Sequence, residues 1–411
     1  MLAWLAGGGF SGVFLKARRK VVQAPSNIGH WFLLHRATVI FGVLAFLASS
    51  SKDAMAIDAC GFGPSANSVM INALADSTTY FSIPFTRTPA FCGLVAGIAG
   101  NTITVTDNLG APPAGAGLAG LTPGPDSYYV VITSGVKEGA GYTTNAAVAM
   151  TVATVTVNPP PDSCENLAGV VVGGVGVGDQ IAIIPYWTLT TVWPGTPPAN
   201  ITGGGSAGAS TDIELFNPVT QAFDVFYYKN AGIGGVGWRK TTSASINAAN
   251  QSIPPYQTIV LLQHMGAPNL AFALPPAGGV AGYEVKYKTR ACLYAPPAGN
   301  PWFNFVSNYH YYPPAFGQAL APSLLQNGIT ASRWFCFPPG IKDRLLVYDN
   351  TVPGINKAPK DIYFYNFCTS HWRRVPLPIN ADGVKVFEAG TGTVILRVAG
   401  FPSPLIWVDP P

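Results

Sequence analysis

The feature that most constrains the fold is an internal repeat in the second half of the chain. Four blocks recur in the same order, with the second copy 131–137 residues after the first. The first copy reads DIELFN, DVFYY, WRK and TIVLL from residues 212, 224, 238 and 258, and the second reads DRLLVY, DIYFY, WRR and TVIL from residues 343, 361, 372 and 393. Near-constant spacing over four blocks indicates a duplicated structural unit, with copies at about residues 211–264 and 342–398.

The residues of these blocks favour strands over helices. Thr, Val, Ile and aromatic residues dominate them, and the links between them contain many of the 46 Gly and 37 Pro of the chain. Such residues suit strands and turns, so the sequence predicts an all-β protein. Before the repeat, short strand-like runs lie at residues 78–85, 102–106, 127–135, 150–158 and 179–187. Their spacing predicts a small barrel or sandwich.

The chain divides into three parts by composition. The Pro- and Gly-rich stretch 194–210 reads as a linker, so we expect an N-terminal β domain over residues 57–200 and a duplicated β-sandwich unit over residues 201–411. Residues 1–56 contain basic residues, the apolar run ATVIFGVLAFLAS and then Ala54-Met55-Ala56. This order is typical of a secretory signal peptide. We predict a cleaved leader and export to the cell surface, extracellular space or periplasm; an uncleaved anchor is the alternative.

The charge balance excludes one class of partner. Residues 1–56 hold six of the 23 Lys and Arg and one of the 19 Asp and Glu, so 17 basic and 18 acidic residues follow them. Binding to a phosphate backbone needs a concentrated basic patch. We therefore expect no nucleic-acid partner.

All six cysteines lie beyond the predicted leader. An even number in an exported chain is compatible with disulfide bonds, in any of 15 pairings. The alternative is that several are small buried apolar residues. The candidates are Cys60, Cys92, Cys164, Cys292, Cys336 and Cys368.

Several motifs together carry a resemblance. The segments DRLLVYDNTVPGINK, WRR and EAGTGTVILR, with STTYFSIPFTRTPAF and YYVVITSGVKEG nearer the N-terminus, resemble a family of uncharacterised exported bacterial proteins with a C-terminal D-x-L-L-V-[FY]-D-N-T, W-R-[KR] and G-T-G signature. The resemblance spans most of the chain after the leader. It implies export and a strand-rich fold, and it implies no activity. The cysteines and the segment NPWFNFVSNYHYYPP depart from the family pattern.

Constellations that would support catalysis or metal binding are sparse. His264, His310 and His371 are far apart in sequence, and no HExxH or Cys/His cluster occurs. Asp212 and Glu214 would share one face of a strand, which is suggestive of paired carboxylates, but a solvated strand end explains them better. We predict no metal, no cofactor and no catalytic residue.

Aromatic and Arg side chains are the better binding candidates. Indole and guanidinium groups that recur in both copies could stack on sugars or on a partner protein, although a duplicated Trp also suits a duplicated core. The candidates are Trp238, Arg239, Trp372, Arg373 and Arg374, with Tyr309, Tyr311 and Tyr312 in the aromatic segment.

The stretch DNTVPGINK, residues 349–357, admits two interpretations. Asp349, Asn350 and Asn356 could offer oxygen ligands to Ca²⁺, but such loops carry several acids at alternating positions. Asn, Asp, Pro and Gly also suit a turn, and the stretch is longer than its counterpart NPVTQAF in the first copy. We predict a connection between two strands.

The sequence as a whole predicts an exported structural or assembly protein of the cell surface. Low charge and many strands favour association with further copies or with other surface components. A carbohydrate-binding or adhesive module is the alternative, and an enzyme acting on polysaccharide is the least supported.

Overall fold

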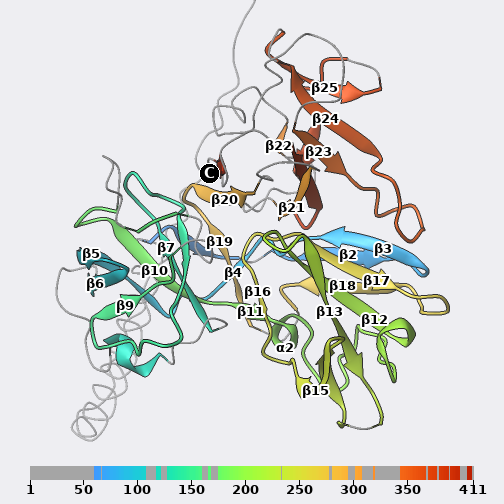
Figure 1. The fold of residues 1–411 in the computed structure, drawn as a ribbon, viewed down its shortest axis with the longest axis horizontal. Helices are drawn as coiled ribbons and strands as arrows, with labels where there is room; N and C mark the ends of the chain where they lie inside the picture. Colours follow the sequence, from blue (N-terminus) through green and yellow to red (C-terminus); the bar gives the residue numbers. More distant parts are fainter. Residues whose placement is uncertain are drawn as a thin grey trace, which may run out of the picture. The chain divides into compact units, whose positions relative to one another are not determined.

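A computed structural model gives the arrangement of the chain (Figure 1). It describes residues 60–65, 67–107, 117–121, 127–159, 165–167, 175–232, 234–276, 280–294, 301–307, 318–319, 343–366, 369–376, 379–387, 389–398 and 405–409. Their regular structure is almost entirely antiparallel β-sheet, which confirms the predicted all-β class. The predicted leader lies outside the described residues. None of the helices within these ranges has the length and apolarity needed to cross a membrane.

Six strands in the first half form a closed barrel. They are β5 (Phe91–Ala99), β6 (Thr102–Thr106), β7 (Tyr128–Ile132), β8 (Gly141–Thr143), β9 (Thr154–Thr156) and β10 (Gln180–Pro185), hydrogen-bonded in the order β8-β7-β10-β5-β6-β9. The two end strands meet, because Thr144 bridges to Val157 and the Asn158 N–H donates to the Thr143 carbonyl at 2.8 Å. Closure removes exposed edges and encloses an apolar core. Of the two architectures predicted for this region, the barrel is the one formed.

Side chains alternate between the two faces of the barrel wall. On β7, Val130 and Ile132 point into the barrel core, whereas Tyr129 and Val131 belong to a second cluster outside it. Successive side chains of a strand point to opposite faces, and here both faces of β7 are covered by apolar residues. The second cluster lies between the barrel and a small sheet of β1 (Phe62–Pro64), β19 (Gly282–Val285) and β4 (Thr86–Arg87).

The two repeat copies form two sheets with the same strand order. The first contains β3 (Ser77–Phe81), β12 (Thr211–Asn217), β13 (Ala222–Lys229), β14 (Gly237–Lys240), β15 (Ser243–Asn247) and β17 (Ile259–Gln263), in the order β15-β14-β13-β12-β17-β3. The second contains β21 (Trp302–Ser307), β23 (Arg344–Val347), β24 (Asp361–Asn366), β25 (His371–Val375) and β27 (Gly392–Arg397), in the order β25-β24-β23-β27-β21. The four blocks found in the sequence are therefore β12, β13, β14 and β17 in one sheet and β23, β24, β25 and β27 in the other.

Strand pairing crosses the domain boundary that we predicted at residue 200. The predicted strand 78–85 does not join the barrel, since β3 pairs with β17 of the first repeat sheet. The remaining short sheets pair β2 (Val69–Ala73) with β18 (Leu270–Leu274), β11 (Trp187–Thr188) with β16 (Ser252–Ile253), β20 (Thr289–Leu293) with β28 (Leu405–Asp409) and β22 (Gln318–Ala319) with β26 (Lys385–Phe387). Several strands between residues 57 and 200 therefore pair with strands beyond residue 200, and such pairing partners are not encoded locally.

Matching side-chain amides cap the end strands of both repeat sheets. Asn350, in the loop between β23 and β24, accepts from the Tyr80 N–H at 3.0 Å and donates to the Tyr80 carbonyl at 2.7 Å. Gln221, in the turn between β12 and β13, accepts from the Phe303 N–H at 2.7 Å and donates to the Phe303 carbonyl at 3.0 Å. Each copy thus closes the edge strand of the other, which would otherwise present unpaired backbone groups. The stretch 349–357 is a connection, as predicted.

Two equivalent threonines lie where the copies meet. The Thr258 hydroxyl accepts from the Thr393 N–H at 3.0 Å, and its one proton is shared between the Val306 carbonyl at 2.6 Å and the Thr393 carbonyl at 2.9 Å. The Thr393 hydroxyl donates to the same Val306 carbonyl at 2.8 Å. Both threonines are buried. A fully hydrogen-bonded buried joint fixes the register of the two sheets against each other.

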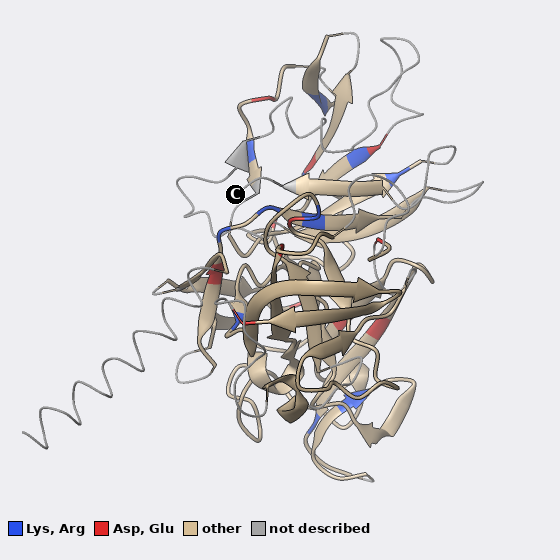
Figure 2. Cartoon of the chain, turned by 90° about the vertical axis from the view of Figure 1, so that its left-hand side faces the viewer, with Lys and Arg blue, Asp and Glu red and all other residues tan. Residues whose placement is uncertain are grey.

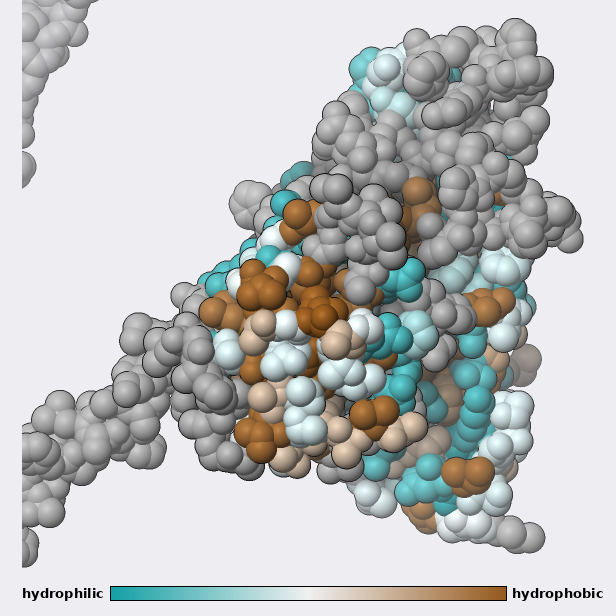
Figure 3. Space-filling view, turned by 60° about the vertical axis from the view of Figure 1, so that its left-hand side comes forward, coloured by the Kyte–Doolittle hydropathy of each residue, from teal (hydrophilic) through white to brown (hydrophobic). Residues whose placement is uncertain are grey.

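The surface carries few charges. Figure 2 shows Lys, Arg, Asp and Glu as isolated positions along the strands, and Figure 3 shows apolar side chains in several groups on the face it presents. Among the exposed apolar residues are Val136, Val177, Val236, Ile246 and Met265.

Candidate functional site

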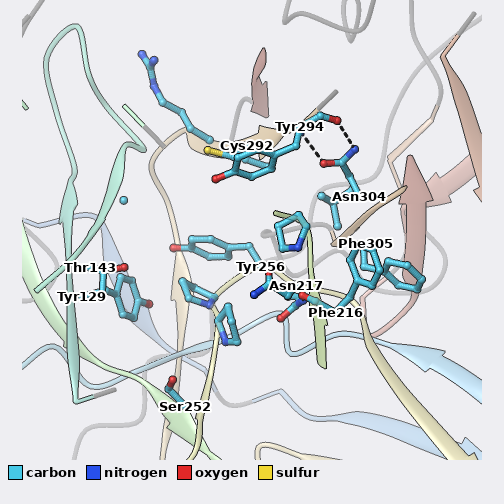
Figure 4. A pocket seen from close by; sticks show the side chains of 18 of the residues that line it. Tyr129, Thr143, Phe216, Asn217, Ser252, Tyr256, Cys292, Tyr294, Asn304 and Phe305 are labelled. Carbon is cyan, nitrogen blue, oxygen red and sulfur yellow. Dashed lines mark hydrogen bonds between the residues drawn. The ribbon is translucent and has the colours of Figure 1, made fainter. Parts of the chain in front are cut away.

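A cavity of about 590 Å³ lies where several strands and turns of the described residues meet. The ends of β8, the β12–β13 turn, the segment before β17, and strands β20 and β21 surround it (Figure 4). Its lining is rich in Tyr, Pro and amide side chains. The main contributors are Tyr129, Tyr142, Tyr186, Phe216, Asn217, Pro254, Pro255, Tyr256, Gln257, Arg290, Tyr294, Asn304 and Phe305.

Tyr256 occupies the centre of the cavity in an uncommon backbone conformation. Its φ angle is 75°, in the left-handed region that bulky residues rarely adopt. It follows Pro254-Pro255 and precedes the buried joint at Thr258, so the chain on both sides restricts it. Backbone strain of this kind persists only where the surroundings impose it, and it gathers at functional sites.

Hydroxyl groups beneath Tyr256 hold its ring in place. Its oxygen lies 3.3 Å from that of Tyr287 and is also hydrogen-bonded to Tyr129. Burial raises the pKa of Tyr256 to about 12 and raises those of Tyr129 and Tyr287 well above their ordinary value. All three are therefore neutral at physiological pH. The result is a rigid phenol with one face toward the cavity.

A second tyrosine lies across the cavity from the first. Figure 4 shows Tyr294 next to Cys292, with its backbone bound by the Asn304 side chain. The Asn304 amide accepts from the Tyr294 N–H at 2.7 Å and donates to its carbonyl at 2.9 Å. Phe305 continues this wall and packs against Phe216 with ring centroids 4.5 Å apart. Two aromatic walls thus enclose the space.

Arg290 is the charged residue among the described lining residues, and its charge is already matched. It donates to Glu165 at 2.9 Å and to the carbonyls of Glu138 and Val136 at 2.8 and 2.6 Å. Lys137 also pairs with Glu165. Because each of the three guanidinium nitrogens donates a hydrogen bond, the cavity offers no uncommitted cation among the residues described here.

Two polar atoms of the lining have no hydrogen-bond partner within the described part of the chain. They are the Tyr142 hydroxyl and the Gln257 Oε1 atom. Burial raises the pKa of Tyr142, so its hydroxyl stays protonated. Buried polar groups are satisfied in most native structures. These two buried atoms lie beside the same cavity.

The Trp and Arg residues predicted for binding occupy other places. Trp238 and Trp372 are 2% and 1% exposed and pack edge-on against Tyr228 and Tyr365. Arg239 is buried, where it donates to the carbonyls of Trp238 and Gly235. Both indoles lie in the duplicated core, which is the alternative role considered for them in the sequence.

The remaining candidates are dispersed. Arg373 donates to the Thr369 hydroxyl, and Arg374 pairs with Asp361 at the outer edge of the second repeat sheet. Tyr309, Tyr311 and Tyr312 lie outside the described residues. The structure does not bring Arg373 and Arg374 to the cavity.

Three of the six cysteines lie within the described residues. Cys60 and Cys92 are thiols near the barrel wall, and Cys292 lies on β20 at the cavity. Cys164, Cys336 and Cys368 lie outside the described residues.

Acidic and metal-binding groups do not gather at the cavity. Over the described ranges, no set of three or more His, Cys, Asp or Glu side chains is placed to hold a metal ion. Asp212, one of the paired carboxylates considered above, is buried and lies 2.7 Å from His264. Burial raises the pKa of Asp212 and of Glu214. Both are residues of β12 in the first repeat sheet, and neither lines the cavity.

Comparison with known proteins found no similar chain. No family model, curated protein or solved structure matches the chain. Sequence reasoning missed the cavity tyrosines because they come from separate segments. The one local signal is Pro-Pro-Tyr at residues 254–256, where two rigid residues precede an aromatic one.

Proposed function

We propose that the protein is an exported, non-catalytic carbohydrate-binding protein, and that its cavity takes a neutral sugar ring against Tyr256. The observation that carries this proposal is the Tyr256 ring itself, held in a left-handed backbone conformation at the centre of the cavity. An aromatic face fixed before binding loses little conformational entropy when a ligand packs on it.

The chemistry of the lining supports a sugar. Sugar rings combine apolar C–H faces with many hydroxyl groups, and the cavity combines aromatic walls with amide and phenol groups. Gln257 Oε1 can only accept a hydrogen bond, so it needs a donor such as a sugar hydroxyl. Arg290 already donates to groups of the protein itself, so it is not open to a negatively charged ligand. This favours a neutral sugar over a uronic acid or a phosphate.

A glycan array probed with the purified mature chain tests the proposal. Saturable binding to neutral glycans is expected, and it should weaken about tenfold or more in Tyr256→Gly. Glycine is the appropriate replacement because it removes the ring and is comfortable at a φ angle of 75°. Tyr283→Ala, which changes a partly buried tyrosine on β19 outside the lining, is the matched control and should bind as the parent does.

Two results would overturn the proposal. One is the absence of any glycan ligand for the folded parent protein. The other is undiminished binding by Tyr256→Gly, which would move the ligand away from this cavity.

Assembly at the cell surface is the second candidate. It is favoured by β15, an end strand of the first repeat sheet whose residues are mostly exposed, with Ile246 64% exposed. Asn350 and Gln221 cap two of the end strands, β3 and β21. The end strand β15 pairs with β14 along one side. An exposed edge strand can pair with another chain.

A further inference from the structure

Two thiols lie together beneath the tyrosines that support the cavity. Cys60 is fully buried just before β1, and Cys92 is partly buried on β5. The Cys60 Sγ–H group points to the Ile181 carbonyl at 3.9 Å, and the cross-strand partner of Cys92 is Ala182, the next residue along β10. Both sulfurs therefore lie against the same point of the barrel wall.

The two side chains contact each other directly. They are hydrogen-bonded, and this bond together with burial raises the pKa of the Cys92 thiol. Their surroundings are apolar and aromatic, including Phe62 and Tyr287. Within the described part of the chain, no group of three or more His, Cys, Asp or Glu side chains that could hold a metal ion includes them. Contact between two thiols that are far apart in sequence is the arrangement from which a disulfide forms with little backbone movement.

We propose that Cys60 and Cys92 form a disulfide bond in the exported protein. The two thiols give up two protons and two electrons to a disulfide oxidant of the export compartment, which is reduced to two thiols. The partly buried Cys92 attacks the oxidant first, forming a mixed disulfide and releasing one thiol. Cys60 then attacks the Cys92 sulfur, the Sγ–Sγ bond forms, and the second thiol of the oxidant leaves.

The bond ties the beginning of the exported chain to the barrel. Residue 60 is the fourth after the predicted cleavage site following Ala56, a position where chain ends commonly fray. Phe62, two residues further, packs edge-on against Tyr287, whose hydroxyl supports Tyr256. The disulfide therefore braces the cavity floor. Fixing the end of β1 also holds β19, which pairs with it.

Peptide mapping of the exported, unreduced protein tests the pairing. Free thiols are alkylated during denaturation, and trypsin then cleaves after Arg87, which places the two cysteines in different peptides. The expected result is a disulfide-linked pair of peptides containing Cys60 and Cys92. Alkylation of both thiols, or a link from either cysteine to any of the other four, would overturn the proposal.

Thermal unfolding provides a second measurement that does not depend on the map. Reduction should lower the unfolding midpoint of the parent protein by roughly 5 °C more than that of Cys60→Ala/Cys92→Ala. The double variant is the matched control, since it keeps the other four cysteines and their response to the reductant. An equal response of both proteins would contradict a stabilising Cys60–Cys92 bond.

Discussion

At the residue scale, the duplicated indoles illustrate how a repeat preserves packing. Trp238 lies opposite Tyr228 across the β13–β14 pair, and Trp372 lies opposite Tyr365 across the β24–β25 pair. Both rings meet their tyrosine edge-on, with centroids 5.6 and 5.9 Å apart. The same aromatic pair at the same register marks the core of each copy.

Replacing one of these indoles should therefore damage stability rather than ligand binding. Trp372→Ala is expected to lower the free energy of unfolding by about 3–5 kcal/mol, because it leaves a cavity in a packed core. Urea denaturation followed by circular dichroism measures this. Arg374→Ala, at an exposed position nearby, should cost less than about 1 kcal/mol. A Trp372→Ala protein as stable as the parent would show that the ring is not a core residue.

Asp349 makes the stability of the 349–357 loop, which contains Asn350, depend on pH. Hydrogen bonds from the Thr351 side chain and backbone, with Lys360 3.1 Å away, lower the pKa of Asp349 from 3.8 to about 2. A carboxyl whose pKa is lower in the folded state stabilises the fold at pH values above its pKa in the unfolded state. This stabilisation is lost as the pH falls from about 4 to 2.

The effect is expected to be small because the carboxyl is close to solvent. At pH 7, Asp349→Asn should lower the free energy of unfolding by less than about 1 kcal/mol. The difference from the parent protein should shrink as pH falls and vanish near pH 2, as measured by urea midpoints at successive pH values. A difference that does not change with pH would mean that the charge is not responsible.

At the scale of elements, the two amide caps are the least expected feature of the fold. Asn350→Ala leaves the Tyr80 N–H and carbonyl without their partner, which should cost about 1–3 kcal/mol. Gln221→Ala should have a similar effect through Phe303 at the other sheet. Val352→Ala, at an exposed position of the same loop, is the control and should be near neutral. Unfolding of the three variants in guanidinium chloride checks whether Asn350→Ala and Gln221→Ala are both less stable than Val352→Ala.

How far the sequence could predict these elements depends on the range of their contacts. The constant offset between WRK and WRR located equivalent strands in both copies, since hydrophobic patterning is local. By contrast, Asn350 meets Tyr80 across 270 residues, and no local pattern marks such a bond. The cavity was missed for the same reason, because Tyr256 and Tyr294 become neighbours only through the pairing of distant strands.

At the scale of the whole molecule, exposed β15 is the element from which assembly could proceed. If this edge pairs with another copy, Ile246→Lys should abolish concentration-dependent association, because a charge on an edge strand opposes pairing. Light scattering over a range of concentrations measures this. Val219→Lys, which places the same charge at an exposed turn, should associate as the parent does. A parent protein that stays monomeric throughout would exclude this edge as an assembly surface.

The reciprocal caps also limit how this gene can change. Repeats within one gene tend to exchange segments, and such exchange usually keeps the copies alike. Here the loop with Asn350 is longer than the turn with Gln221, and each caps the end strand of the opposite copy. A chain that received the same loop in both positions would leave one edge strand open to aggregation. We expect the two loops to diverge over evolutionary time even while the strands around them stay alike.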